Sequence, residues 1–179
     1  MKKLYIIKNS KLHGKGLFAK ESIKAGTNVI EYVGEKITKA QSDKIAKIQL
    51  KKAEKNKDEG QVYIFTLNDK YDINGNVSYN KARLMNHSCD PNCDTDIIDN
   101  KIWIRSFRDI RKGQELTYDY GFAFDKDDFR DHVCRCRSNK CVGFISHYPK
   151  SFIFLSQSVL RFGNIISSVK KNRAIAKNH

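Results

Sequence analysis

The chain has 179 residues, of which 40% are hydrophobic and 11% aromatic, and it carries a formal net charge of +14. These values are typical of one globular domain with a buried core and argue against a disordered chain. No apolar run approaches the roughly 20 residues of a membrane-spanning helix, and the apolar stretch after Lys3 is too short for a secretory signal. We therefore expect a soluble intracellular protein.

Short strands are predicted where Ile, Val, Tyr and Phe gather between glycines or polar turns. Three such stretches precede the middle of the chain: residues 4–7, 27–33 and 62–67. Between the last two, Ile45, Ile48 and Ala53 fall near helical spacing among Lys, Gln and Glu. Residues 38–58 are therefore predicted to form an exposed amphipathic helix, inserted on one side of a sheet.

Further along, two apolar runs flank the pair Asp99-Asn100, which favours a tight turn, so residues 97–104 are predicted to form a hairpin. After Pro149 the chain is first apolar and then basic. This tail is consistent with a helix docked on the domain or with a partner-binding element, and the sequence leaves both open. The predicted fold class is β-rich with α additions.

The positive charge is unevenly distributed. No acidic residue follows Cys134, whereas acids outnumber bases in residues 89–133. The basic ends could attract nucleic acid without specificity or could be an ordinary solvated lysine-rich surface. The acidic middle could receive a basic peptide through the following residues: Asp90, Asp94, Asp96, Asp99, Asp125, Asp127 and Asp128.

Three segments have patterns that suit a binding site. In His13-Gly14-Lys15-Gly16, two glycines permit a sharp turn and a close approach to a ligand, although an ordinary turn would look the same. The segment from Arg83 to Cys93 contains Asn86-His87 among apolar residues and is predicted to be bent and hydrogen-bonded rather than helical. Glu115 to Gly121 is typical of a strand that ends at a glycine.

Cysteines form the fourth segment. The run Cys134-x-Cys136-x4-Cys141 suits Zn²⁺, whose structural sites are tetrahedral and rich in sulfur. An odd number of cysteines and no secretory signal favour metal over disulfides. A fourth ligand must come from elsewhere, and the candidates are Cys89 and Cys93. Basic residues inside the run would offset the thiolate charge: Arg135, Arg137 and Lys140.

Taken together and in this order, the four segments resemble the SET family of protein lysine methyltransferases, in particular its trithorax-like branch. The similarity runs from about Lys8 to Ile145. It implies short strands in small sheets, with a C-terminal strand threaded through a loop as a pseudoknot. It also implies a SET domain at 4–121, a zinc-bound post-SET segment at 130–146 and a basic C-terminal extension at 147–179.

The resemblance implies S-adenosylmethionine as cofactor. His13 and Lys15 would lie near its amino-acid end and ribose, and Asn86 and His87 would bind its methionine and adenine parts. Arg135, with Phe144 and Ile145, would cover the adenine. The full expected set of cofactor-binding residues is His13, Lys15, Gly16, Tyr63, Arg83, Asn86, His87, Tyr120, Arg135 and Ile145.

Three tyrosines match the catalytic positions of the family. Tyr63 would line the channel for the substrate lysine, and Tyr120 would lie nearest the methyl group that is transferred. Tyr118 stands where the family alternates between Tyr and Phe, and its hydroxyl would limit the product to mono- or di-methylation. The zinc would be structural, and the resemblance implies its ligands: Cys89, Cys134, Cys136 and Cys141.

The implied substrate is a histone tail or another basic DNA-associated protein. Nucleic acid would at most be contacted weakly through the basic ends, and no membrane is involved. The site of action could be the cytoplasm, the nucleoid, the nucleus or, after export, a host nucleus. The alternative function is a non-catalytic SET-like module that binds chromatin or nucleic acid. A decayed enzyme of that kind would be expected to lose Tyr120 or the Asn86-His87 pair, and both are present.

Overall fold

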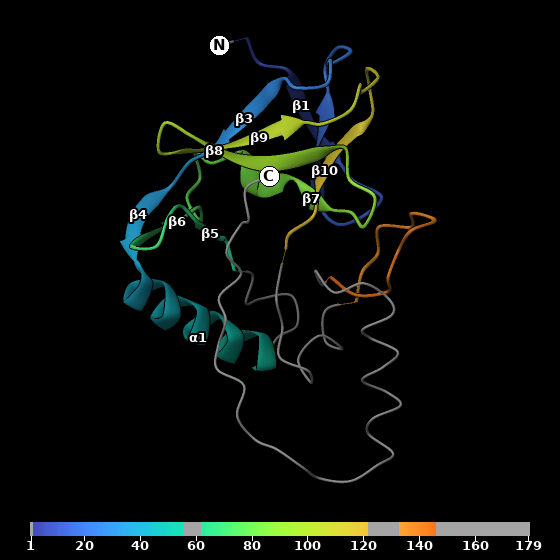
Figure 1. Ribbon diagram of the computed structural model, residues 1–179. Coiled ribbons are helices and arrows are strands. Elements are labelled where there is room, and N and C mark those ends of the chain that lie inside the picture. Colours follow the sequence, from blue (N-terminus) through green and yellow to red (C-terminus); the bar gives the residue numbers. More distant parts are fainter. Residues whose placement is uncertain (1, 56–61, 122–132, 146–179) are drawn as a thin grey trace, which may run out of the picture. The chain divides into compact units, whose positions relative to one another are not determined.

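The structure, a computed structural model, describes residues 2–55, 62–121 and 133–145 (Figure 1). The described residues form strands, one α-helix and a 3-10 turn: β1 (Tyr5–Asn9), β2 (Lys15–Ala19), β3 (Asn28–Tyr32), β4 (Glu35–Thr38), α1 (Lys39–Lys55), β5 (Ile64–Thr66), β6 (Tyr71–Asn74), the turn Ala82–Leu84, β7 (Asn86–His87), β8 (Cys93–Ile98), β9 (Lys101–Ser106) and β10 (Glu115–Tyr118). None of these helices is long and apolar enough to cross a membrane.

The chain divides into two compact units. The first contains the chain up to Asn86 together with Pro91–Tyr118. The second contains His87–Asp90 and the described residues after Tyr118.

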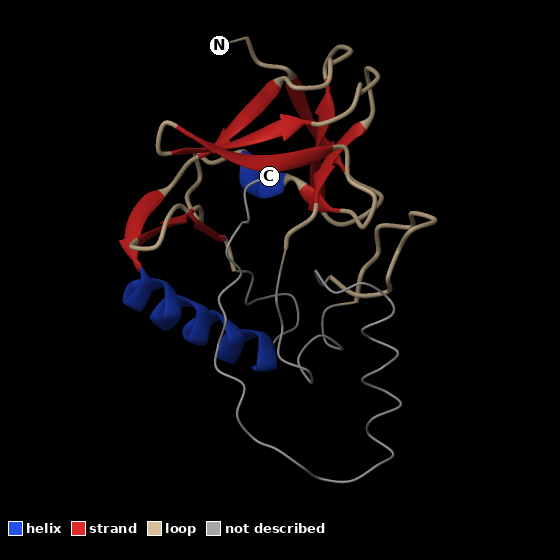
Figure 2. Cartoon of the chain, in the orientation of Figure 1, coloured by secondary structure: helices blue, strands red, loops and turns tan. Residues whose placement is uncertain are grey.

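The strands form three small sheets, shown in red in Figure 2. Their strand orders are β1-β2-β10-β7, β3-β9-β8 and β4-β6-β5. The late strand β10 thus lies between β2, from the start of the chain, and β7. Small sheets of short strands with a single described helix confirm the predicted β-rich fold class.

The predicted strands are confirmed as β1, β3 and β5, with bounds that differ by one or two residues at their ends. The hairpin is confirmed as β8 and β9, which pair antiparallel from Cys93↔Ser106 to Ile98↔Lys101. Its two turn residues, Asp99 and Asn100, have φ angles of 51° and 59°. Both therefore adopt the left-handed conformation that the tight hairpin turn requires, and Asp and Asn tolerate it better than other non-glycine residues.

Helix α1 confirms the helical insert and lies against β4 and β6 of one sheet. It starts with a capping box. The Gln41 side chain accepts a hydrogen bond from the Thr38 N–H at 2.8 Å, and the Gln41 N–H donates to the Thr38 hydroxyl at 3.3 Å. Ile45 is half-buried, whereas Ile48 remains 46% exposed, so the buried apolar stripe is narrower than the spacing predicted.

The core of the first unit holds side chains from β2, β9 and β10. Ile102 and Ile104 alternate with less buried neighbours on β9, as a strand with one buried face requires. Leu17 on β2 and Leu116 on β10 are both completely buried. Because Leu116 is fixed in the core, the end of β10 that carries Tyr118 is fixed with it.

Several predictions fall outside the described residues. They concern the side chain of Ala53, the acids Asp125, Asp127 and Asp128, and the ends of the expected post-SET segment. The tail from residue 147 onward also lies outside.

A buried ion pair joins the start of α1 to β6. The Asp72 side chain accepts hydrogen bonds from the Lys39 ammonium and from the Ser42 hydroxyl. The Lys39 and Asp72 side chains are only 16% and 6% exposed. Removing one partner of such a pair leaves a buried charge without compensation, which costs far more than the net strength of the pair.

We expect Asp72→Ala to lower the free energy of unfolding by about 3 kcal/mol, because Lys39 loses its buried partner. The matched control is Glu21→Ala, which removes an ion pair with Lys2 whose side chains are 69% and 40% exposed. That variant should lose less than about 1 kcal/mol. Urea denaturation of both variants measures the difference, and equal losses would contradict the structural role of Asp72.

Candidate functional site

The loop before β2 is held by the side chain of Asn86. Gly14 has a φ of +48°, in the left-handed region that favours glycine. The Asn86 amide is 7% exposed, and its nitrogen donates to the main-chain carbonyls of His13 at 3.2 Å and Lys15 at 3.3 Å. The structure therefore brings together the Gly-x-Gly loop and the asparagine that the sequence singled out separately. His13 and Lys15 expose their side chains, whereas Gly16 is buried.

A carboxylate completes this cluster. Glu115, at the start of β10, accepts hydrogen bonds from Asn86 at 2.8 Å and from the Ser10 hydroxyl at 2.7 Å. A Cβ atom added at Gly16 would lie 2.3 Å from the Glu115 carboxylate and 3.2 Å from the Asn86 amide nitrogen. Close approach of the Glu115 and Asn86 side chains therefore favours glycine at residue 16. Sequence reasoning missed Ser10 and Glu115 as members of this cluster.

These residues fit the amino-acid end of the implied cofactor. Two main-chain carbonyls and one carboxylate gather around the Asn86 amide, so the loop is rich in hydrogen-bond acceptors. Acceptors and negative charge are what an ammonium group requires. The chemistry of the loop is therefore compatible with the cationic methionine moiety of S-adenosylmethionine.

An aromatic cluster surrounds Tyr118 in the first unit. Tyr118 is 7% exposed, and its ring centroid lies 5.9 Å from that of Phe65. Phe65 in turn packs on Tyr32, with centroids 4.8 Å apart. Sequence reasoning identified Tyr118 but missed Phe65 and Tyr32. Their β-strand periodicity gave no sign that three different strands would bring these rings together.

Tyr63 is fixed through its main chain and lies beside Arg83. Its carbonyl accepts hydrogen bonds from the Tyr32 hydroxyl at 3.0 Å and from the Gly75 N–H at 2.7 Å. The Arg83 guanidinium lies 5.7 Å from the centroid of the Tyr63 ring. Burial raises the pKa of Tyr63, although the Arg83 charge opposes this shift. The Tyr63 hydroxyl is therefore protonated at neutral pH.

Asn92 holds β10 in place with its side chain. Its amide nitrogen donates to the Glu115 carbonyl at 2.7 Å, and its amide oxygen accepts from the Thr117 N–H at 3.0 Å. The side chain thus satisfies main-chain groups as a neighbouring strand would. Asn92 was not among the predicted site residues, although it lies in the same segment as Asn86.

In the second unit, the ring of His87 contacts Tyr120. The Tyr120 N–H donates to Nδ1 of His87 at 3.2 Å, and the two rings meet edge to face with centroids 5.4 Å apart. His87 is 6% exposed, and this burial lowers its pKa, while Asp119 at 3.6 Å acts in the opposite direction. The imidazole is therefore neutral at pH 7.

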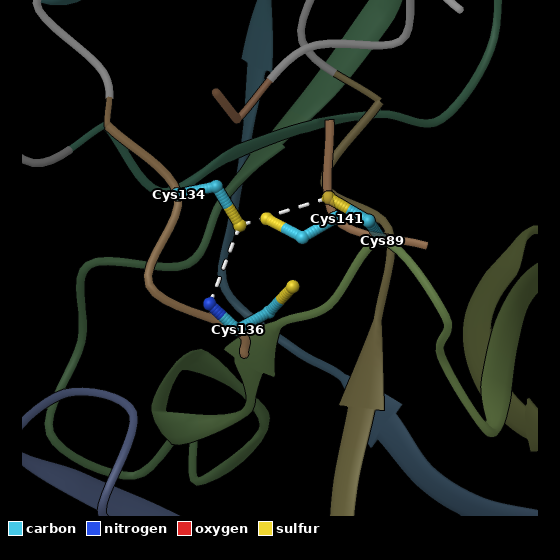
Figure 3. Close-up of side chains that lie close together, drawn as sticks. All are labelled: Cys89, Cys134, Cys136 and Cys141. Atoms are coloured by element: carbon cyan, nitrogen blue, oxygen red, sulfur yellow. Dashed lines mark hydrogen bonds between the residues drawn. The ribbon is translucent and has the colours of Figure 1, made fainter. Parts of the chain in front are cut away.

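Four cysteines of the second unit direct their sulfurs toward one another (Figure 3). All four Sγ atoms lie within 4.8 Å of one another: Cys89, Cys134, Cys136 and Cys141. This is the expected ligand set, with the fourth thiol supplied by Cys89. Cys93 is instead completely buried within β8 in the first unit. Four thiols at this spacing match a closed tetrahedral zinc site.

Main-chain groups shape the loop that carries three of these thiols. The N–H of Cys136 donates to the sulfur of Cys134, and the N–H of Gly143 donates to that of Cys141, both at 3.4 Å. An isolated bridge between Val133 and Phe144 closes the loop at its ends. Within it, Arg135 is exposed and Ile145, just beyond, is half-buried. Their expected contact with adenine stays a prediction.

The thiols differ in acidity without metal. Burial raises the pKa of Cys89 to about 11. Burial also acts to raise the pKa of Cys136, but hydrogen bonds from the main chain of Cys89 and Ser138 and from neighbouring side chains outweigh it and lower the pKa to about 6. Zinc binds thiolates, so metal binding at this cluster is expected to release protons.

We expect the wild-type chain to bind zinc in equimolar amount and each variant Cys89→Ser, Cys134→Ser, Cys136→Ser and Cys141→Ser to lose tight binding, because a structural site needs four ligands. Cys93→Ser is the matched control and should retain the metal. Elemental analysis after dialysis against a chelator measures the content. Loss of zinc from Cys93→Ser, or full retention of zinc by any of the four ligand variants, would contradict the assigned ligand set.

Comparison with known proteins agrees with these features. The sequence profile of the SET domain matches residues 14–121. The histone-lysine N-methyltransferase, H3 lysine-4 specific, of Saccharomyces cerevisiae is 38% identical over 149 residues, which are 81% of this chain and 13% of the yeast protein. The protein of the same name from Aspergillus oryzae is 37% identical over 141 residues, covering 76% of this chain and 11% of the relative.

Histone-lysine N-methyltransferase trithorax of Drosophila virilis is 35% identical over 143 residues, covering 76% of this chain and 3% of the relative. This chain thus spans only a small part of the length of these relatives. The profile matches more than half of the chain, and it includes the Gly-x-Gly loop, the Asn86-His87 pair and β10. The chain belongs to the SET domain family.

Proposed function

We propose that this chain is a protein-lysine N-methyltransferase that uses S-adenosylmethionine to methylate a histone. The observation that carries the proposal is the Asn86 cluster. A buried amide holds the Gly-x-Gly loop by two main-chain carbonyls and is itself held by the Glu115 carboxylate. Family membership supports the reaction class, and the hydrogen-bond acceptors of this cluster support a site for the methyl donor at the Gly-x-Gly loop.

When bound, S-adenosylmethionine supplies a methyl group made electrophilic by the positive sulfonium. The carbonyls of His13 and Lys15 and the Glu115 carboxylate would hold its amino-acid end. Contacts from the remaining expected residues are part of the proposal: Gly16, Tyr63, Arg83, His87, Tyr120, Arg135 and Ile145. The protein must mainly align the acceptor amine with the methyl carbon at about 3–3.5 Å.

The acceptor lysine must be neutral to act as a nucleophile. With a reference pKa near 10.4, its deprotonation at pH 7 costs about 4.6 kcal/mol. An apolar channel lowers this cost, because desolvation disfavours the ammonium form. Tyr118 and Phe65, which pack on each other, would form such a wall, and Tyr63, an uncharged phenol of the same unit, would also line the channel. Tyr120 would contact the methyl group through its hydroxyl, by weak C–H···O interactions.

A histone H3 tail is the substrate we propose to test first. The yeast and Aspergillus relatives are named as specific for H3 lysine 4. In this chain, exposed Asp94 and Asp96 on β8 offer negative charge for a basic peptide, although Asp96 already pairs with Arg105 at 2.8 Å. A histone substrate would place the activity in a nucleus. A contact with nucleic acid through the basic ends remains a separate expectation.

We expect the zinc-loaded chain to transfer labelled methyl groups from S-adenosylmethionine to H3, and Tyr120→Phe to reduce kcat at least about tenfold. Loss of one hydroxyl contact made in the transition state is worth about 1.4 kcal/mol or more. The control is Tyr79→Phe, because the Tyr79 side chain is 62% exposed.

A panel of histones and other basic DNA-associated proteins should be assayed in parallel. Transfer to a lysine that depends on Tyr120 but not on Tyr79 supports the enzyme. Binding of the cofactor product without transfer to any member of the panel would favour the non-catalytic module instead.

We also expect mono-methylated lysine as the main product, with some di-methylation, since the Tyr118 hydroxyl limits the room for a larger amine. Tyr118→Phe should shift the product toward di- and tri-methylation without a comparable loss of kcat, whereas Tyr79→Phe should not. Mass spectrometry of the peptide over time gives the distribution. Rapid tri-methylation by the wild-type chain would refute the assigned role of Tyr118.

A further inference from the structure

The imidazole of His87 contacts the cysteine cluster as well as Tyr120. Its Nε2 lies 3.4 Å from Sγ of Cys89, and its Nδ1 lies 3.2 Å from the main-chain nitrogen of Tyr120. A main-chain N–H can only donate, so Nδ1 must accept and carries no proton in this arrangement. The ring proton is then on Nε2, where it is directed at the sulfur.

We propose that His87 is a positioning residue that connects the zinc centre to the segment carrying Tyr120. Its Nε2–H donates to the Cys89 thiolate, while its Nδ1 holds the main chain of Tyr120. This role belongs to the ring and is distinct from the cofactor contact expected of residue 87. The metal-binding part does not depend on the proposed function, whereas the effect on turnover rests on it.

A hydrogen-bond donor such as the Nε2–H of His87 would stabilise the Cys89 thiolate. Zinc with four thiolates carries a formal charge of −2, and N–H···S hydrogen bonds disperse this charge over neighbouring groups. Cys134 and Cys141 receive main-chain N–H groups from Cys136 and Gly143. Cys89 receives the main-chain N–H of Val142 and, from a side chain, that of His87. Removing outer partners of metal ligands typically costs 10–100-fold in affinity.

The other side of the ring restrains Tyr120. Besides the hydrogen bond at Nδ1, the two rings meet edge to face with centroids 5.4 Å apart. The Asp119 carboxylate lies 3.6 Å from Nδ1, beyond ordinary hydrogen-bond length, so the Tyr120 N–H is the closer partner. Zinc bound at Cys89 would therefore also restrain His87 and, through Nδ1 of His87, the main chain at Tyr120.

Two substitutions of His87 each remove one of its two contacts, with Cys89 or with Tyr120, and keep the other. An asparagine side chain places its amide near the position of Nδ1, so His87→Asn can still accept from Tyr120 but cannot reach Cys89. A glutamine places its amide near the position of Nε2, so His87→Gln can still donate to Cys89 but loses the acceptor for Tyr120. Each variant is therefore the control for the other, at the same residue and with the same functional group.

The first experiment measures metal binding by the full chain. Zinc affinity is determined by competition with a chromophoric chelator, and Co²⁺, which is visible where Zn²⁺ is silent, replaces zinc for spectroscopy. We expect His87→Asn to bind zinc about tenfold more weakly and to shift the sulfur-to-cobalt charge-transfer band to longer wavelength. His87→Gln should match the wild type within about threefold and keep its band position.

The second experiment measures methyl transfer at saturating zinc, where weaker metal binding no longer matters. His87→Gln should then lose more kcat than His87→Asn, the reverse of their order in metal affinity. Equal effects of the two variants on zinc, or an unshifted cobalt band in His87→Asn, would overturn the proposal. If no variant and no wild-type chain transfers methyl groups, the proposed function fails, while the zinc and cobalt results still decide the contact with Cys89.

Discussion

Two adjacent buried polar residues on the short strand β7 each hold one cluster of polar groups, Asn86 in the first unit and His87 in the second. Asn86 donates to the loop at His13 and Lys15, and His87 contacts Cys89 and Tyr120. Successive side chains of a strand point to opposite faces, so two neighbouring residues can serve two different clusters. A register shift of one residue would exchange an amide for an imidazole and break both sets of contacts.

Near this strand, polar side chains form hydrogen bonds that neighbouring strands would otherwise provide. Asn92 forms hydrogen bonds with main-chain groups of β10, and Glu115 accepts a hydrogen bond from Asn86. The loop from Val133 to Phe144 carries three of the four clustered thiols. Such groups are costly to bury unless each finds a partner. The site is therefore specified by a few satisfied hydrogen bonds and tolerates little change at these residues.

Local signals in the sequence were sufficient for part of this arrangement. The hairpin at Asp99-Asn100 and three of the four thiols follow from spacing within a few residues, and the resemblance supplied Cys89. By contrast, the contact between Ser10 and Glu115 joins residues 105 positions apart. The packing of Tyr32 and Phe65 near Tyr118 likewise depends on which strands become neighbours. The spacing of residues within a segment does not determine which strands become neighbours in a sheet. These contacts could therefore not be predicted from one sequence.

The claim that the Asn86 cluster holds the methyl donor can be tested by binding alone. Calorimetric titration of the zinc-loaded chain with S-adenosylhomocysteine avoids any need to know the substrate. The account predicts a single binding site per chain. It also predicts at least a tenfold loss of affinity in Asn86→Ala, since without the Asn86 amide the loop carbonyls and the Glu115 carboxylate are no longer held in place for the cofactor. Undiminished binding by a folded, zinc-loaded Asn86→Ala variant, or no binding by the wild type, would contradict it.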